Sequence, residues 1–342
     1  MRILSIIGAR PQFIKAAVFR KRCLIEGIEE ILVHTGQHYD LEMSLGIFND
    51  LKIKQPDIIF KLKNRSHAGM TAECLSSIEE VILEKKPDLV NVYGDTNSTL
   101  AGALAAAKLN IPIMHIEAGL RSFNKAMPEE VNRILTDHVS EFLFCPTKEA
   151  VKNLMNENIT KGVFHVGDIM LDAVDIFSPF FRFPEQIIKK VNRKLAILTV
   201  HRAETVNNPN LLKKVLDYSR QYCGEYDVVF PIHPNTKNKV EEYKIELNEL
   251  VVTKPLSYLE MQGLLKESDL VLTDSGGLQK EAYFHGCDCI TLRDETEWVE
   301  TIEYGWNKIW TETNYKEPKE KILDFGDGNS AGKMLQYLLE KY

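Results

Sequence analysis

The sequence predicts an α/β protein made of two doubly wound domains, each a parallel sheet with crossover helices. Strand-like apolar runs alternate along the chain with segments of helix length, which is typical of parallel sheets. The 342 residues exceed the usual size of one domain. Two series of such runs flank a poorly periodic segment, 178–192, which contains Pro179 and Pro184 and is the predicted linker.

The first series predicts one domain over residues 1–177. Its strands are expected at Arg2–Ile7, Glu30–His34, Leu89–Tyr93, Ile111–Ile116 and Phe142–Cys145. Helix-like stretches lie between them, among them Thr71–Glu84 and Ser98–Leu109. Because strands and helices alternate, the strands are expected to run parallel.

The second series predicts a similar domain over residues 178–320. Its strands are expected at Leu195–Val200, Asp227–Pro231, Glu249–Thr253, Leu270–Thr273 and Asp288–Leu292. We find no short internal repeat, although the two halves could share an architecture.

Composition excludes several classes of protein. The chain is 44% hydrophobic and 27% charged, which is typical of a soluble globular protein. No apolar run approaches the roughly twenty residues that span a bilayer, and the opening residues read as a strand and not as a signal peptide. The formal charge of −7 and the lack of a long basic block argue against nucleic acid as a partner.

Cysteine spacing indicates a reduced, cytoplasmic protein with no metal site. The six cysteines are scattered, and no Cys-x-x-Cys pair occurs. Cys287 and Cys289 form the only close pair, and one Cys-x-Cys without a second pair is not a zinc pattern.

Polar residues gather where the predicted strands end, which is where open parallel sheets bind their ligands. After the first strand, Gly8, Arg10 and Lys15 could neutralise a diphosphate. The alternative is an ordinary turn with solvated cations, and both remain open. The Gly-x-Gly-x-x-Gly fingerprint of dinucleotide binding is missing from this turn.

Three carboxylates are expected near one edge of the first sheet. Asp95 and Glu117 follow neighbouring strands, and Glu129 lies in the first turn of a helix that Pro128 can open. Asp95 could instead cap a helix, and Glu129 could simply favour a helix N-terminus. Glu117 is harder to explain structurally, because a carboxylate beside a buried strand needs a partner.

In the second domain, Ser275, Gly276 and Gly277 lie between a buried strand and a helix. Such a turn points backbone N–H groups at an anion, although it is often only a tight connection. His201 and His233 each follow a strand of the same sheet. Either imidazole could donate to a phosphate or act as an acid.

Taken together, these motifs resemble the non-hydrolysing UDP-N-acetylglucosamine 2-epimerases of bacteria and archaea. The related hydrolysing enzymes carry Gly-Thr-Arg-Ala-Glu at the first turn, where this chain has Gly-Ala-Arg-Pro-Gln. The resemblance covers nearly the whole chain and rests on Gly8–Gln12, Thr35–His38, Gly94–Thr96, His115–Arg121, Pro128–Glu130, His201–Glu204, His233–Pro234 and Asp274–Gln279.

The resemblance implies a GT-B type fold of two Rossmann-like domains with the nucleotide sugar in the cleft between them. It also implies a C-terminal helix over 321–342 that returns to the first domain. In this family, anti elimination of UDP gives a 2-acetamidoglucal, and re-addition inverts carbon 2, from UDP-N-acetylglucosamine to UDP-N-acetylmannosamine. No cofactor is implied. The expected protein is a cytoplasmic homodimer that supplies cell-surface polysaccharide synthesis.

Carrying the motifs over gives each site residue an expected role. Asp95 and Glu117 are the expected proton carriers, with Glu129 in support, and which of them takes the proton stays open. Glu281 is expected to bind the ribose hydroxyls. The sugar and diphosphate are expected to lie among Lys15, Asp95, Glu117, Glu129, Arg133 and His201, with the UDP also held by Arg10, His233, Ser275, Gly276 and Gly277.

Two departures bear on substrate and regulation. Many family members have Thr-Glu-Arg-Pro-Glu where this chain has Thr296–Glu300, with Trp298 in place of the arginine. That pattern is similar to the branch acting on UDP-2,3-diacetamido-2,3-dideoxyglucuronate, so this substrate is an alternative. A glutamine that helps to bind an allosteric activator in some members is absent at Met70–Thr71, although the candidate allosteric residues Gln37 and His38 are present.

Two other functions would use parts of the same motifs. A GT-B glycosyltransferase would share the fold but transfer the sugar to an acceptor, and three clustered carboxylates argue against it. A non-catalytic nucleotide-sugar sensor would leave carbon 2 unexchanged, and the same carboxylates argue against that role.

Overall fold

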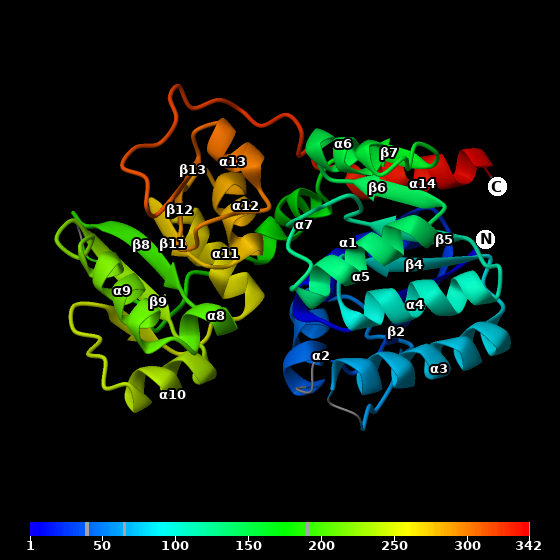
Figure 1. Ribbon diagram of the computed structural model, residues 1–342, viewed down its shortest axis with the longest axis horizontal. Helices are drawn as coiled ribbons and strands as arrows, with labels where there is room; N and C mark the ends of the chain where they lie inside the picture. The colour runs from blue at the N-terminus through cyan, green and yellow to red at the C-terminus, as the bar shows by residue number, and fades with distance from the viewer. Residues whose placement is uncertain (38–40, 64–65, 189, 191, 342) are drawn as a thin grey trace. The chain divides into compact units, whose positions relative to one another are not determined.

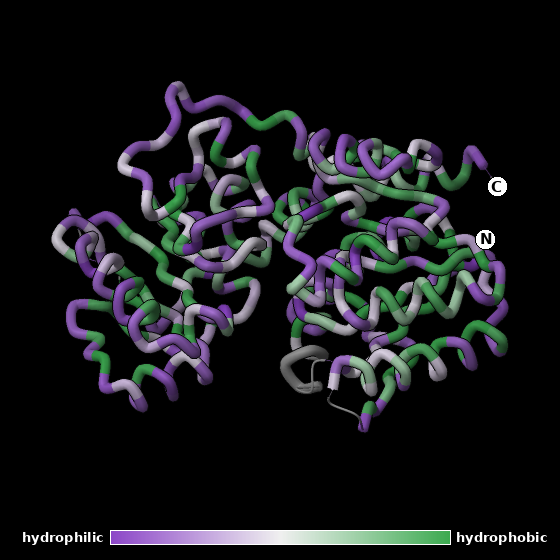
Figure 2. Tube along the Cα trace, viewed as in Figure 1, coloured by the Kyte–Doolittle hydropathy of each residue, from purple (hydrophilic) through white to green (hydrophobic). Residues whose placement is uncertain are grey.

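The protein divides into two units of α/β architecture (Figure 1). This computed structural model describes residues 1–37, 41–63, 66–188, 190 and 192–341. One unit comprises Met1–Ile176 and Leu323–Tyr342, and the other comprises Phe177–Ile322. Figure 2 shows that the strands inside each unit are mostly hydrophobic, whereas the helices alternate between hydrophobic and hydrophilic residues.

The N-terminal unit contains a seven-stranded parallel sheet in the order β3-β2-β1-β4-β5-β6-β7. Its strands are β1 Arg2–Ile7, β2 Glu29–His34, β3 Ile58–Ile59, β4 Leu89–Tyr93, β5 Ile113–Ile116, β6 Phe142–Cys145 and β7 Val163–His165. Its helices are α1 Arg10–Ile25, α2 Leu41–Asp50, α3 His67–Lys85, α4 Asn97–Lys108, α5 Pro128–Val139, α6 Lys148–Asn156, α7 Ile169–Phe177 and α14 Ser330–Lys341.

Close packing of helix on sheet holds this unit together. Helices α3, α4 and α5 lie side by side in Figure 1. Gly102 on α4 allows a close approach, because a Cβ there would lie 3.1 Å from Val92 and 3.2 Å from Ile6. Leu4, Ile6, Val90 and Val92 are fully buried in the resulting core, and parallel strands covered on both faces are expected to be continuously apolar.

Helix α14 belongs to the N-terminal unit although it ends the chain. The carboxylate of Asp172 accepts hydrogen bonds from the backbone N–H groups of Ser330 at 2.9 Å and Ala331 at 2.8 Å. These bonds satisfy donors that a helix N-terminus otherwise leaves without partners. The Tyr337 ring packs on Phe164, with centroids 4.3 Å apart.

The second unit contains a six-stranded parallel sheet in the order β10-β9-β8-β11-β12-β13. Its strands are β8 Lys194–Thr199, β9 Tyr226–Pro231, β10 Val251–Thr253, β11 Leu270–Thr273, β12 Asp288–Thr291 and β13 Asn307–Ile309. A short 3-10 turn, Ser178–Phe180, precedes helices α8 Ala203–Val206, α9 Pro209–Arg220, α10 Pro234–Glu242, α11 Tyr258–Lys266, α12 Gly276–Phe284 and α13 Val299–Glu303.

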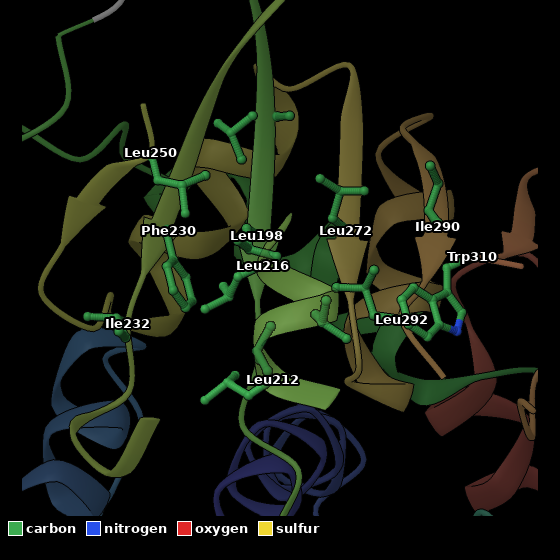
Figure 3. Close-up of a cluster of buried hydrophobic side chains, with 14 of the residues drawn as sticks. Leu198, Leu212, Leu216, Phe230, Ile232, Leu250, Leu272, Ile290, Leu292 and Trp310 are labelled. Carbon is green, nitrogen blue, oxygen red and sulfur yellow. The ribbon is translucent and has the colours of Figure 1, made fainter. Parts of the chain in front are cut away.

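Figure 3 shows how one face of this sheet is covered. Side chains from neighbouring strands, among them Leu198, Phe230 and Leu272, point toward Leu212 and Leu216 of α9. All five are fully buried. Helix α9 is therefore amphipathic, and its apolar face covers this side of the sheet.

The predicted fold, two Rossmann-like domains of the GT-B type, is confirmed by these two parallel sheets with alternating helices. The short strands β3, β7 and β13 were not predicted. They have two or three residues each, too few for a recognisable apolar run, and β3 and β7 have no fully buried residue. Within the described residues, no helix is both long and apolar enough to cross a bilayer.

Candidate active site

The turn after β1 is tied to the turn after β4 by one side chain, Gln12. Its Oε1 accepts hydrogen bonds from the N–H groups of Gly8 at 2.7 Å and Ala9 at 3.0 Å. Its Nε2 donates to the backbone carbonyl of Tyr93 at 2.6 Å. Gly8 is required there, since a Cβ would lie 2.1 Å from the Ser98 hydroxyl. The two strand ends are therefore fixed relative to each other.

Glu117, after β5, is held in an unusual backbone conformation beside this turn. Its φ is +73°, in the left-handed region that non-glycine residues rarely adopt. The carboxylate pairs with the Nζ of Lys15, which is 5% exposed. Its Oε2 lies 3.1 Å from the position that a Cβ on Gly94 would take. Glu117 therefore lies next to the β4 turn that carries Asp95.

Asp95 pairs with Arg133 of α5. Arg133 also donates to Oε2 of Glu130 at 2.8 Å, and Glu130 is 1% exposed. Burial favours the neutral form of Glu130, but hydrogen bonds from Ser122 and the charge of Arg133 prevail and lower its pKa. Thr96 is the N-cap of α4, so the alternative that Asp95 is a helix cap is wrong.

A buried ionic network holds the turns that follow β4 and β5. The His115 ring lies 2.7 Å from Asp137 through Nδ1 and 2.7 Å from the carbonyl oxygen of Gly94 through Nε2. The ring therefore links the carboxyl group of Asp137 to the backbone of the β4 turn. Arg121 donates to Asp137 at 2.7 Å. Burial favours protonation of Asp137, but the charges of His115 and Arg121 outweigh it and lower the pKa.

The remaining predicted residues of this unit are more exposed. Arg10 and Glu129 are exposed at the first turns of α1 and α5. Gln37 accepts hydrogen bonds from the backbone N–H of Ser98 at 3.1 Å and from its hydroxyl at 2.7 Å. His38, the other candidate allosteric residue, lies outside the described residues.

In the second unit, Asp274 organises the turn that carries His201. Asp274 is fully buried at the end of β11 and accepts hydrogen bonds from the backbone N–H groups of His201 and Arg202, both at 2.9 Å. The His201 Nδ1 lies 3.1 Å from the other carboxylate oxygen, and the ring is half exposed. His233, which is exposed, caps α10 by accepting from the N–H of Asn235 at 3.3 Å.

The predicted anion seat, Ser275–Gly277, forms the start of α12. Helix α12 begins at Gly276 with Ser275 as its N-cap, so backbone N–H groups point out of the helix end. Within the described part of the chain, no heavy atom lies within 4 Å of where a Cβ on Gly277 would stand. Glu281 follows Gly277 by four residues and therefore shares its face of the helix.

One carboxylate already lies beside this seat. Glu297 Oε1 is 2.0 Å from the position of a Cβ on Gly276, so a larger residue there would displace the Glu297 carboxyl group. Glu297 pairs with Arg293 at 3.0 Å and Arg202 at 3.7 Å. Burial opposes ionisation, but the charge of Arg293 dominates and lowers the pKa of Glu297.

Three organising residues received no role from the sequence. Gln12 lies three residues after the N-cap Ala9, the spacing of a capping box, but Ala9 lacks the hydroxyl side chain by which this motif is recognised in a sequence. Glu130 lies three residues before Arg133, which indicates a helical ion pair. Asp274 has no local signal, because its partners lie 72 and 73 residues away.

These strand ends define a class: two-domain α/β proteins in which one sheet carries paired carboxylates and the other an anion seat. Among the described residues, no group of three or more His, Cys, Asp or Glu side chains could hold a metal ion.

Comparison with known proteins specifies the family. Residues 24–339 match the model of the family described as UDP-N-acetylglucosamine 2-epimerase. A UDP-2,3-diacetamido-2,3-dideoxy-D-glucuronate 2-epimerase of Pseudomonas aeruginosa is 49% identical over 314 residues, covering 90% of this chain and 88% of the relative. A UDP-N-acetylglucosamine 2-epimerase homolog of Methanococcus maripaludis is 44% identical and covers 99% of both chains.

A solved structure gives the same result. The Methanocaldococcus jannaschii UDP-GlcNAc 2-epimerase, in complex with UDP-GlcNAc and UDP, has a TM-score of 0.83 and 34% identity over 99% of this chain and 100% of that one. The protein therefore belongs to the UDP-N-acetylglucosamine 2-epimerase family. The prediction of an epimerase is confirmed at the level of this family, and the glycosyltransferase alternative gains no support.

Proposed function

We propose that the protein inverts carbon 2 of a UDP-N-acetylhexosamine, interconverting UDP-N-acetylglucosamine and UDP-N-acetylmannosamine. The observation that carries the proposal is Glu117, held at a φ of +73° and paired with Lys15 next to the turn that carries Asp95. Strained backbone of this kind persists where the surrounding structure enforces it, and it is common at active sites. Family membership supplies the reaction class.

The chemistry requires two proton carriers and a good leaving group. A proton on carbon 2 of an acetamido sugar is barely acidic, so anti elimination of UDP must carry the charge away as the proton leaves. Re-addition of UDP to the 2-acetamidoglucal, with proton return to the opposite face, inverts the centre. Asp95 and Glu117 would divide these proton transfers, with Glu129 in support, and the ion pairs with Arg133 and Lys15 would hold the two carboxyl groups in place.

We assign binding of the diphosphate to hydrogen-bond donors and positively charged side chains. The N–H groups of Ser275, Gly276 and Gly277 and the imidazole of His201 would stabilise the charge that develops on departing UDP. Arg10 and Arg133 would add positive charge. His233 would donate to the same phosphates, and Glu281 would bind the ribose hydroxyls.

Proton NMR in deuterated water tests the reaction. Purified protein incubated with UDP-N-acetylglucosamine should give the manno epimer with deuterium at carbon 2. Unchanged substrate, with protium retained at carbon 2, would contradict the proposal, unless the alternative substrate described next reacts instead.

The same chemistry on UDP-2,3-diacetamido-2,3-dideoxyglucuronate is the second candidate. The Pseudomonas aeruginosa relative named for this substrate is 49% identical. In addition, the chain has Trp298 within Thr296–Glu300, the sequence pattern that resembles this branch. Deuterium incorporation measured with both substrates in parallel decides between them.

We also propose that the protein is a cytoplasmic homodimer that supplies polysaccharide synthesis. All six cysteines are free thiols and five are buried, as is usual in a reducing compartment. Val131, Leu135 and Val139 repeat at a spacing of four on α5 and remain 42%, 45% and 37% exposed. An exposed apolar stripe of this kind is a candidate subunit interface.

A further inference from the structure

Three polar side chains form a row that begins with the predicted ribose-binding residue, Glu281. Gln262, on α11, donates from its Nε2 to Oε2 of Glu281 at 2.8 Å. Its Oε1 lies 2.7 Å from Nε2 of His285, which follows the end of α12. Gln262 is fully buried, so neither end of its amide can turn to water instead.

The hydrogen-bonding pattern of this row has one consistent direction. The amide nitrogen of Gln262 faces Glu281 and donates to its carboxyl group, and the amide oxygen faces His285 and accepts from its ring. His285 must then carry its hydrogen on Nε2. Burial and the charge of Lys266 lower the pKa of His285 to about 4, so the ring is a neutral donor at neutral pH. Glu281 therefore receives an oriented donor.

The linker that begins the second unit holds the row in place. A Cβ on Gly263 would lie 2.2 Å from the carbonyl oxygen of Arg182, so only glycine lets the linker pack this closely on α11. The N–H of Arg182 donates to the carbonyl of Leu259 at 3.3 Å. The Phe181 ring meets the His285 ring edge-on at 5.8 Å. Gln262 and His285 are thus fixed by backbone and ring packing together.

We propose that Gln262 and His285 are positioning residues that orient the Glu281 carboxylate toward the ribose hydroxyls of the bound nucleotide. This inference rests on the proposed function, which assigns the ribose to Glu281. Glu281 lies four residues after Gly277, hence about 6 Å further along the same face of α12. A carboxylate has about four acceptor sites, enough to accept from an amide and from two vicinal hydroxyls together.

Comparing two nucleotides isolates the positioning role from general stability. Binding of UDP and of 2′,3′-dideoxy-UDP is measured by calorimetry on the full chain and its variants. The unaltered protein should prefer UDP by about tenfold or more, because loss of hydrogen bonds to a charged acceptor is costly. Gln262→Met, similar in length but without the amide, should lose most of this preference while its affinity for the dideoxy nucleotide changes less than about twofold.

His285 provides a matched pair of variants. His285→Leu removes the donor and should reduce the preference for UDP in the same direction as Gln262→Met. His285→Gln keeps an N–H donor and should restore much of the preference. A purely structural role predicts instead that both nucleotides weaken together in every variant, and that result would overturn the inference. An unchanged preference in Gln262→Met would overturn it as well.

Glu281→Ala separates failure of the inference from failure of the proposed function. If this variant loses the preference for UDP and Gln262→Met keeps it, only the positioning role is wrong. If Glu281→Ala keeps the preference, the ribose assignment is wrong and the inference falls with it. If the unaltered protein binds neither nucleotide, the proposed function itself is refuted, which the deuterium experiment tests independently.

Discussion

Asp274 and His201 are 73 residues apart in sequence, yet the buried carboxylate of Asp274 accepts the backbone N–H of His201 at 2.9 Å. A second bond, from the N–H of Arg202, makes Asp274 the acceptor for two consecutive donors. The end of β8 is thereby tied to the end of β11, immediately before the Ser275–Gly277 seat. The imidazole and the seat are consequently held together by one fully buried side chain.

Replacing Asp274 should therefore affect nucleotide binding and stability together. Asp274→Ala leaves two N–H groups without acceptors, at about 1–3 kcal/mol each in free energy of unfolding. We expect UDP affinity to fall by at least about tenfold. Urea unfolding and calorimetry measure the two effects. Asp288→Asn, at the opposite end of the same sheet and paired with Lys319, is the control and should change neither by much.

The sequence predicted the elements whose patterns are local and missed the contacts that the fold creates. The strand from Arg2 to Ile7 and the Ser-Gly-Gly turn are visible because their residues are consecutive. Gln12 was visible as part of a motif, but its bond to the carbonyl of Tyr93 spans 81 residues and depends on β1 lying beside β4. Such partners depend on the order of strands in the sheet, which cannot be read from a single sequence.

The carboxylates of the N-terminal unit should be needed for turnover and not for nucleotide binding. Asp95→Asn and Glu117→Gln keep the shape of the side chains but remove proton transfer, which typically contributes about 10²- to 10⁴-fold. Turnover should fall by at least about a hundredfold, with UDP affinity within about threefold. Deuterium incorporation and calorimetry provide the two measurements. Glu149→Gln, on α6, is the control. Near-normal turnover in both Asp95→Asn and Glu117→Gln would show that these residues do not transfer the proton.

Gly277→Ala tests the anion seat without disturbing the fold. Within the described residues a Cβ at this position meets no heavy atom within 4 Å, and alanine favours a helix by about 1 kcal/mol over glycine. Thermal stability should therefore be kept or rise slightly. If the diphosphate approaches this backbone closely, the methyl group should nevertheless weaken UDP binding by about tenfold. Gly224→Ala, also unobstructed within the described chain, is the control, and equal UDP affinities in the two variants would argue against the seat.

The exposed stripe on α5 predicts the oligomeric state. Leu135→Lys places a charge in the middle of Val131, Leu135 and Val139, where burial against a second copy would be costly. Light scattering should report a dimer for the unaltered protein and a monomer for the variant. Leu83→Lys, at an exposed position on α3, is the matched control. A dimer that survives Leu135→Lys would place the interface elsewhere.

Glu30 should make the stability of the N-terminal unit depend on pH. Its side chain is 2% exposed, and burial raises its pKa to about 7, against an ordinary value of 4.5, although the hydrogen bond from Ser5 and the charge of Arg20 oppose the rise. Below about pH 4.5 the group is protonated in both the folded and the unfolded chain. As the pH rises from there through 7, the unfolded chain releases this proton more readily than the folded chain does. The folded state therefore loses about 3 kcal/mol of stability over this range.

Glu30→Gln removes this titration while keeping an oxygen for the Ser5 hydroxyl, which donates at 2.6 Å. The difference in free energy of unfolding between the variant and the unaltered protein should change with pH. From pH 4.5 to pH 8 it should shift by about 3 kcal/mol in favour of the variant. Hydrogen exchange of β1 and β2 amides, compared between proteins at each pH, measures the opening of this unit. Glu29→Gln, on the exposed side of the same strand and paired with Arg2, should show no such change. A difference that stays constant with pH would mean that the buried carboxyl group does not titrate in this range.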